Sequence, residues 1–291
     1  MKCRPEFFGT AALPQVDISK ERLEELAKNS ISAGLTVPGV QKKLSVHLSD
    51  DHSSRLTLVG YPAGYILKPQ TEAFSQLPEA EDLVMDIADM MGVMTVPHGL
   101  IDTDIGPAYI TKRVDRRGVE KYAMEDFCQL NNRLTQDKYR GSYERCGGII
   151  RRHSARVGFD LSEFYLRLVV CFVTGNSDMH LKNFSLIETE PGSREYVLSP
   201  AYDLMPANII LPDDKEETAL ALNGKKANLW RKDFMALADN IGLNRKAAES
   251  LIGSVLKRKD EAQKMCRESS LNEDMQNALI DLMETRCDRL K

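Results

Sequence analysis

The spacing of apolar residues changes partway along the chain, from alternation to helical repeats. Alternating apolar and polar positions predict strands at Leu44–Leu48 and Tyr65–Pro69. Apolar residues at helical spacing, between Pro78 and Gly92, predict one amphipathic helix over Pro78–Met91. Further strands of this first part are expected at residues 55–59, 94–98 and 106–114.

The second part of the chain reads mainly as helix. Residues 166–173 are apolar nearly all round, which predicts a buried helix over residues 161–174, and Gly175 is a natural helix stop. Two short runs at residues 184–187 and 195–198, with a turn between them, predict a β-hairpin. Further helices are expected at residues 124–130, 143–150, 229–239, 245–257 and 271–290.

These patterns predict an α+β chain with two lobes. We expect a small, strand-rich N-lobe at residues 1–115 and a larger, all-helical C-lobe with one hairpin at residues 116–291. With 42% hydrophobic and 28% charged residues, the composition is that of an ordinary soluble globular protein.

Three global features narrow the classes of function. The net charge of −4 argues against a surface devoted to nucleic acid. No stretch of the sequence approaches the roughly 18 consecutive apolar residues of a membrane span, and the N-terminus lacks the apolar core of a signal peptide. The six cysteines are scattered without a Cys-x-x-Cys pair, which favours free thiols over a disulfide framework or a zinc site. We therefore expect a cytoplasmic protein without a membrane segment.

The polar stretch after the buried helix carries the first candidate chemistry. Asn183 follows Asp178 by five residues, and Asp203 comes after the expected hairpin. A protein kinase uses an Asp, an Asn and a second Asp in this order: the first accepts the proton of the substrate hydroxyl, and the others hold Mg²⁺ on the ATP phosphates. Alternatively, these residues form a polar turn in which Asp and Asn cap their own backbone.

Two features of the first part fit the same chemistry. Lys68 ends an expected strand, and Glu81 lies at the edge of the buried face of the following helix, so the two could pair as a kinase lysine and glutamate do. Glu81 could equally complement the helix dipole. The segment 30–43 is rich in glycine and hydroxyl groups, but Val40 and Gln41 stand where a Walker A motif needs Lys and Ser or Thr. A P-loop NTPase is therefore excluded.

Seven short motifs, in this order, resemble the HipA family of Ser/Thr kinases, the toxins of bacterial toxin–antitoxin operons. The resemblance covers about residues 30 to 240. The motifs lie at residues 38–45, 65–69, 79–81, 113–116, 125–128, 176–185 and 201–203.

The resemblance implies a kinase-like, HipA-like fold and a role for each matching residue. It implies that Asp178 is the catalytic base and that Asn183 and Asp203 are magnesium ligands. It implies ATP contacts by the glycine loop, the Lys68–Glu81 pair, a hinge at residues 112–114, the ribose-binding Asp115, and further residues of the C-lobe. The implied ATP-binding residues are Pro38, Gly39, Val40, Gln41, Lys42, Lys43, Lys68, Glu81, Lys112, Arg113, Val114, Asp115, His180, Asn183, Tyr202 and Asp203.

Family members also phosphorylate a hydroxyl of their own glycine loop. Thr36 stands at the matching position, with Ser32 and Ser30 as second choices. At the hinge, Lys112 and Val114 replace the usual acidic residue and Phe, which changes the packing around adenine.

The front of the chain resembles a particular branch of the family. Long members carry roughly 100 more residues before the kinase core, about the length of a small domain. The chain is therefore expected to be like the short form, HipT, of three-gene operons. Its implied partners are a small HipS-like antitoxin and a HipB-like helix-turn-helix protein, with DNA contacted only indirectly.

Three hypotheses for function follow. The first is a Mg-ATP-dependent protein serine/threonine kinase toxin that phosphorylates a cellular protein, for which the family implies an aminoacyl-tRNA synthetase, and its own glycine loop. The second is a small-molecule kinase of the aminoglycoside or choline type, which shares the Asp–Asn–Asp arrangement. The third is a non-catalytic subunit of a DNA complex, using basic patches at residues 151–156 and 225–232.

Overall fold

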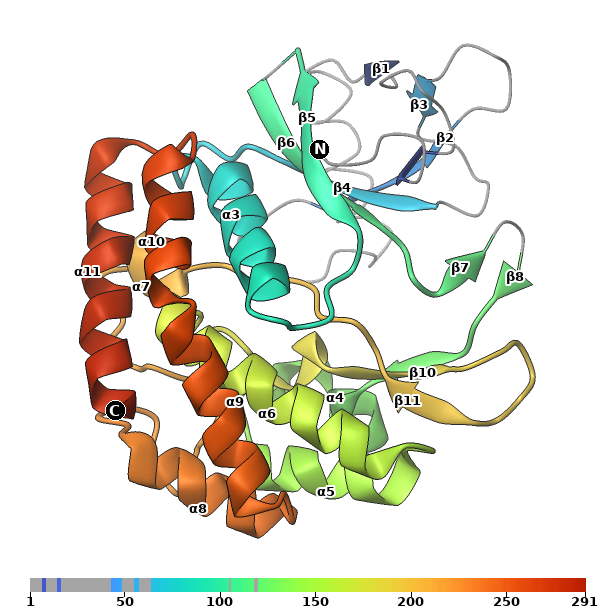
Figure 1. Cartoon of the computed structure of the whole chain (residues 1–291). Coiled ribbons are helices and arrows are strands. Elements are labelled where there is room, and N and C mark those ends of the chain that lie inside the picture. The colour runs from blue at the N-terminus through green and yellow to red at the C-terminus, as the bar shows by residue number, and fades with distance from the viewer. Residues whose placement is uncertain are drawn as a thin grey trace. The chain divides into compact units, whose positions relative to one another are not determined.

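The chain divides into two compact units (Figure 1). The first comprises Met1–Asp82 and Val96–Val119, and the second comprises Leu83–Thr95 and Glu120–Lys291. Helix α3 (Leu77–Met90) begins in the first unit and ends in the second. The computed structural model describes residues 7–8, 15–16, 43–48, 55–57, 64–104, 106–117 and 120–291.

The first unit is built on one mixed sheet. Its strand order is β1-β3-β2-β4-β6-β5, with β1 and β3 parallel and every other neighbouring pair antiparallel. The strands are β1 (Gln15–Val16), β2 (Leu44–Leu48), β3 (Arg55–Thr57), β4 (Tyr65–Pro69), β5 (His98–Thr103) and β6 (Gly106–Lys112), and the short strand β7 (Arg116–Arg117) follows them. The strands predicted at residues 44–48 and 65–69 are confirmed over their full lengths.

The core of this unit follows from the alternation along its strands. In β2, Leu44 and Val46 are buried, whereas Ser45 between them is exposed, because successive side chains of a strand point to opposite faces. Both pack in one apolar cluster with Tyr65, whose hydroxyl donates a hydrogen bond to the carbonyl oxygen of Phe7 at 2.9 Å.

One predicted strand, at residues 94–98, is wrong, because β5 begins only at His98. The backbone of Met94 is used elsewhere in the second unit. Its amide donates to the Glu163 carboxylate at 3.1 Å, and its carbonyl accepts from the Ala201 amide at 2.7 Å. A backbone whose donor and acceptor are taken in this way cannot join the sheet of the first unit.

The second unit is mainly helical. It contains one small antiparallel sheet, in the order β11-β10-β9, which includes the predicted hairpin. The strands of the second unit are β8 (Glu120–Lys121), which lies outside this sheet, β9 (Met124–Asp126), β10 (Ser185–Glu188) and β11 (Tyr196–Leu198). Its α-helices are α4 (Phe127–Leu130), α5 (Tyr143–His153), α6 (Val157–Thr174), α7 (Ala207–Ile210), α8 (Arg231–Ile241), α9 (Arg245–Lys257), α10 (Lys259–Glu268) and α11 (Glu273–Leu290).

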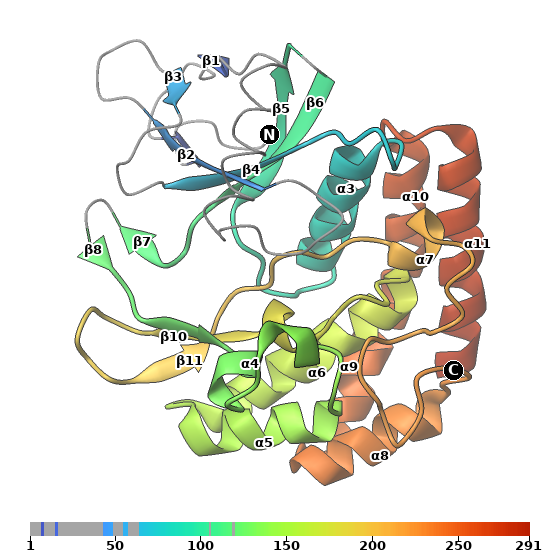
Figure 2. The ribbon, with the colours of Figure 1, turned by 180° about the vertical axis from the view of Figure 1, so that it is seen from behind.

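Helix α6 is the buried centre of the second unit. Every residue from Glu163 to Thr174 is buried, as the apolar run predicted. Helices α5, α8, α9 and α11 all contact it (Figures 1 and 2). The helix ends at Gly175, which has a φ of 76° and where an added Cβ would collide with Leu282 of α11. Only glycine meets both conditions.

Two expectations for the second unit need correction. Residues 124–130 are not one helix: Met124–Asp126 form β9, which pairs with β10, and only Phe127–Leu130 are helical. Pairing with a strand distant in the sequence overrides the local helical pattern. Helix α10 was not predicted, because its residues are mostly polar and no breaker separates it clearly from α9. In the part of the chain that the structure describes, no helix is long and apolar enough to cross a membrane.

Candidate active site

The turn after α6 places Asp178 on a rigid support. The Arg286 guanidinium of α11 donates to the Phe172 carbonyl and to the Asn208 side-chain oxygen, both at 2.6 Å. The backbone amide of Asn208 in turn donates to the Gly175 carbonyl at 2.9 Å. Burial lowers the pKa of Arg286 to about 10, so the side chain stays charged at neutral pH. The end of α6 is thereby held by charge-assisted hydrogen bonds from another helix.

Hydrogen bonds from both directions fix the backbone of Asp178. Its amide donates to the Asn176 side-chain oxygen at 3.2 Å, and its carbonyl accepts from Asn183 Nδ2 at 2.9 Å. The local-capping alternative is therefore partly correct, because both Asn residues do bond to nearby backbone groups. The same bonds also bring Asp178 and Asn183 together.

His180 lies within electrostatic reach of both predicted acidic residues of the site, Asp178 and Asp203. It is 6% exposed, and burial lowers the pKa of its imidazole to about 4, although the charges of Asp178 and Asp203 oppose that shift. The ring is therefore neutral at neutral pH. Its Nδ1 atom is buried, and among the described residues no atom forms a hydrogen bond with it. A buried ring nitrogen without a partner is unusual and fits a group that a ligand completes.

The hairpin returns the chain toward the same site. Ser199 donates its amide to the Ser185 carbonyl at 2.9 Å, directly after β11. The Tyr202 hydroxyl donates to the Lys182 carbonyl at 3.1 Å and lies 2.5 Å from Ser185 Oγ. Asp203 then adopts a φ of 58°, which is uncommon outside glycine and occurs often at functional sites.

The donor set fits the predicted magnesium ion. Because Asn183 uses its Nδ2 atom on Asp178, its side-chain oxygen is the atom that can face a cation. This oxygen and the Asp203 carboxylate are hard oxygen donors, the kind that Mg²⁺ uses alongside water and substrate phosphates, so these two residues are the ones that could hold the ion. Within the described ranges, no group of three or more His, Cys, Asp or Glu side chains could hold a metal ion.

One neighbour of Asp178 was missed by the sequence analysis. The Tyr139 hydroxyl donates to Asp178 Oδ1 at 2.7 Å from the irregular segment before α5. The two residues are separated by 39 positions, and no motif or periodicity marks Tyr139. Only tertiary structure reveals this contact.

In the first unit, the predicted pair of Lys68 and Glu81 is present. The Lys68 ammonium donates to Glu81 Oε1, and the two residues are 2% and 0% exposed. The ammonium also lies 5.2 Å from the centre of the Tyr109 ring. A buried pair of this kind is better explained by orientation of the lysine than by the helix-dipole alternative alone.

The predicted hinge is largely engaged within the first unit. The amides of Lys112 and Arg113 donate to the carbonyls of Pro97 and Gly64 at 2.9 and 2.8 Å. Arg113 also forms two bonds to the Asp115 carboxylate, at 2.9 and 2.7 Å. Burial by itself would raise the pKa of Asp115, but the hydrogen bonds and charge of Arg113 outweigh it and lower that pKa. A ribose contact by Asp115 would therefore compete with Arg113.

Half-buried Val114 completes the hinge residues, and Lys43, directly before β2, is exposed. The remaining predicted residues lie outside the described residues, so the structure gives no information on them. These are Thr36, Ser32 and Ser30 of the expected phosphorylation site, and Pro38, Gly39, Val40, Gln41 and Lys42 of the glycine loop.

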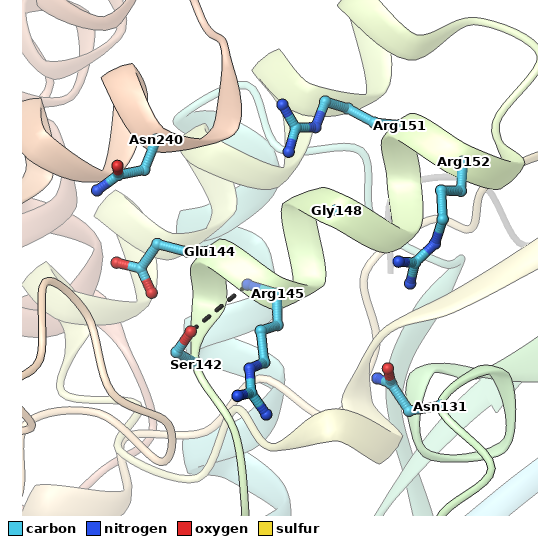
Figure 3. Close-up of a pocket in the computed structure, with 8 residues that line it drawn as sticks. All are labelled: Asn131, Ser142, Glu144, Arg145, Gly148, Arg151, Arg152 and Asn240. Atoms are coloured by element: carbon cyan, nitrogen blue, oxygen red, sulfur yellow. Dashed lines mark hydrogen bonds between the residues drawn. The ribbon is translucent and has the colours of Figure 1, made fainter.

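The first of the two basic patches borders an open cavity of about 680 Å³ (Figure 3). Arg145, Arg151 and Arg152 line it from α5 and form no ion pair within the described part of the chain. Their neighbours in the lining are Asn131, Ser142, Glu144, Gly148 and Asn240. None of these residues belongs to the predicted kinase site.

The second basic patch is partly neutralised by its own neighbours. Lys225 pairs with Asp233 at 2.9 Å, and Lys226 pairs with Glu216 at 3.1 Å. Arg231 donates to the Leu290 carbonyl at 2.9 Å. Two of the four cations of this patch are therefore paired with carboxylates, and Arg231 and Lys232 keep their charge.

The fold is similar to that of two solved structures. A structure of the Shewanella oneidensis HipA toxin–antitoxin system, in complex with HipB and operator DNA, matches with a TM-score of 0.73 at 19% identity, over 92% of this chain and 70% of that one. The Helicobacter pylori proinflammatory kinase CtkA matches with a TM-score of 0.59 at 16% identity, over 83% of this chain and 90% of that one. The predicted α+β, HipA-like fold class is thereby confirmed.

The chain belongs to the HipA-like C-terminal domain family, whose model matches residues 35–263. A relative from Sinorhizobium fredii, named Putative kinase Y4dM, is 33% identical over 235 residues. That match covers 75% of this chain but only 55% of the relative, so the chain spans about half the length of the Sinorhizobium protein.

Proposed function

We propose that the chain is a Mg²⁺- and ATP-dependent protein serine/threonine kinase. The observation that carries this proposal is the turn after α6, where Asn183 bonds to the backbone of Asp178 and both flank the buried, neutral His180. Membership of the HipA-like family supports it, as does the kinase name of the Sinorhizobium relative.

Each residue of the site has a proposed task. Asp178 accepts the proton of the substrate hydroxyl. At the same time the oxygen of that hydroxyl bonds to the γ-phosphorus of ATP, and the bond from this phosphorus to the departing ADP breaks. Asn183 and Asp203 would hold Mg²⁺, which supplies charge neutralisation on the phosphates. In the first unit, Glu81 orients Lys68 toward the phosphates. Positioning and electrostatics, more than covalent catalysis, account for the rate.

At the hinge, we propose that adenine bonds to backbone groups of residues 112–114. The amides of Lys112 and Arg113 already donate to the Pro97 and Gly64 carbonyls, so the Val114 amide is the hinge amide that we expect to recognise the base. Either Asp115 leaves Arg113 to bind ribose, or the ribose contact falls to another residue.

We further propose that this kinase is the toxin of a toxin–antitoxin system. The Shewanella HipA structure contains HipB and operator DNA, which supports a HipB-like partner here and indirect contact with DNA. The HipT-like form, a HipS-like antitoxin, an aminoacyl-tRNA synthetase as substrate, and autophosphorylation at Thr36, Ser32 or Ser30 stay predictions. The described cysteines are free thiols, which supports a reducing cytoplasm.

The rival hypotheses are weaker on structural grounds. A DNA-binding role would use both basic patches, and in the second one Lys225 and Lys226 are already paired with acidic residues, whereas the first keeps Arg151 and Arg152 without an ion pair among the described residues. A small-molecule kinase would share the Asp178 site, so only its product distinguishes it.

The proposal can be tested with γ-labelled ATP in a cell lysate, using the wild-type chain beside Asp178→Asn. We expect label on a lysate protein or on the chain itself, lost in the variant and without change in ATP affinity. Label on a small metabolite alone would favour the second hypothesis. If neither protein nor metabolite gains label, or if Asp178→Asn transfers at a rate near wild type, the proposal is wrong.

A further inference from the structure

Tyr139 contacts the proposed catalytic base directly. Its hydroxyl donates to Asp178 Oδ1 at 2.7 Å, although the ring itself is 44% exposed. Burial of the hydroxyl raises the pKa of Tyr139 well above its usual value, and the hydrogen bond and charge of Asp178 raise it further. The phenol is therefore a permanent hydrogen-bond donor at neutral pH.

The segment that carries Tyr139 is tied to the Asp178 turn at two more points. The Leu181 amide donates to the Lys138 carbonyl at 3.1 Å, and the Tyr143 hydroxyl donates to the Met179 carbonyl at 3.0 Å. These bonds lie on either side of Tyr139 along the chain. The position of its hydroxyl is thus set by the fold and does not depend on a freely rotating surface side chain.

Two neighbours restrict the Tyr139 ring as well. The edge of the ring meets His180 with the ring centres 5.1 Å apart, and the Lys138 ammonium lies 4.9 Å from its centre. Edge-to-face and cation–π contacts of this kind each favour one ring orientation. An exposed tyrosine without a role would have no reason to be held on so many sides.

What remains variable in Asp178 is the orientation of its carboxylate. Its backbone is fixed by Asn176 and Asn183, and one carboxylate oxygen is fixed by Tyr139. This leaves Oδ2 as the oxygen that can accept a proton from a substrate. We propose that Tyr139 is a positioning residue that orients the Asp178 carboxylate for phosphoryl transfer. The inference rests on the kinase function proposed above.

The same contact could act in the opposite way. If the Tyr139 hydroxyl occupied the place of the substrate hydroxyl, it would block the base, and its removal would speed the reaction. A positioning role predicts a slower reaction instead. The sign of the change therefore separates the two roles.

Tyr139→Phe tests the proposal, because it removes the hydroxyl and keeps the ring. The matched control is Tyr122→Phe, since Tyr122 is half-buried and its hydroxyl forms no hydrogen bond with any residue that the structure describes. The measured quantity is the rate of phosphate transfer from ATP and Mg²⁺ to the chain itself, as a function of ATP concentration. Circular dichroism and Tm show whether each variant folds.

We expect the rate at saturating ATP to fall about tenfold in Tyr139→Phe, which corresponds to about 1.4 kcal/mol of transition-state stabilisation. The ATP concentration for half-maximal rate should stay unchanged, as should the rate of Tyr122→Phe.

Two results would overturn the inference: an unchanged rate in Tyr139→Phe, or a faster rate. A fall in rate that accompanies loss of structure would be resolved with Tyr139→Trp, which keeps an aromatic donor and should recover part of the rate if positioning matters. If the wild-type chain itself transfers no phosphate to any protein, the proposed function fails, which is a separate outcome.

Discussion

Two adjacent glycines of α5 should respond in opposite ways to the same substitution. A Cβ added at Gly147 would lie 2.5 Å from Ile241 Cγ2 and 2.8 Å from Ile241 Cβ, in the interface between α5 and α8. A Cβ added at Gly148 would meet nothing within 4 Å. Because Ile241 is fully buried and its Cβ cannot move by rotation of the side chain, Gly147→Ala must shift a helix.

The magnitude of the difference can be worked out from these contacts. Alanine gains about 1 kcal/mol over glycine from helix propensity at either position. Overpacking at Gly147 costs roughly 1–3 kcal/mol. Gly148→Ala should therefore be about 1 kcal/mol more stable than wild type, and Gly147→Ala should lie roughly 1–3 kcal/mol below Gly148→Ala. For a chain of this size, that corresponds to a Tm difference of roughly 2–12 °C.

Thermal unfolding followed by circular dichroism measures this difference directly. The two variants share the same helix and the same change in the unfolded chain, so their comparison isolates packing. If Gly147→Ala is as stable as Gly148→Ala, the packing of α5 against α8 described here is wrong.

The remaining predictions concern one ion pair in each unit. Glu81→Gln should weaken ATP binding about tenfold, measured by calorimetry, because Lys68 loses the negative charge that orients it. The control Glu79→Gln, on the same helix, should bind ATP as wild type does. Equal affinities in all three proteins would refute the role of the pair. Burial by itself would raise the pKa of Asp233, but hydrogen bonds, led by the one from Lys225, outweigh burial and lower that pKa. The carboxylate therefore stabilises the fold above its unfolded pKa of about 3.9, and this contribution is lost as pH falls through the lower folded pKa. Urea unfolding should therefore show that Asp233→Asn is less stable than wild type at pH 7 and loses stability less steeply below about pH 4; parallel curves would contradict this account.

Local patterns were enough to predict much of the fold. The alternation of Leu44–Leu48 and the apolar run inside α6 each determine one element from neighbouring residues, and the structure confirms both. Strand β9 could not be found in this way, because residues 124–126 become a strand only by pairing with β10, some 60 positions later.

The candidate site shows the same limit. Motif order brought attention to Asp178 and Asn183, and the structure places them in contact. Motif order could not reveal that the Tyr139 hydroxyl donates to the Asp178 carboxylate, or that Arg113 already bonds to the Asp115 carboxylate. These contacts depend on how loops fold and carry no periodic signal. The chemical roles of these residues are predictions that only activity measurements can test.

The central claim is that Asp178 serves in phosphate transfer to protein. Its most direct test is the mass of the intact chain and of its peptides after incubation with ATP and Mg²⁺ in the presence of a cell lysate, starting from protein free of phosphate. The account predicts one added phosphate in the segment 30–36 of the wild-type chain, or on a lysate protein, and none with Asp178→Asn. Equal phosphate in both proteins, or none on any protein, would contradict it.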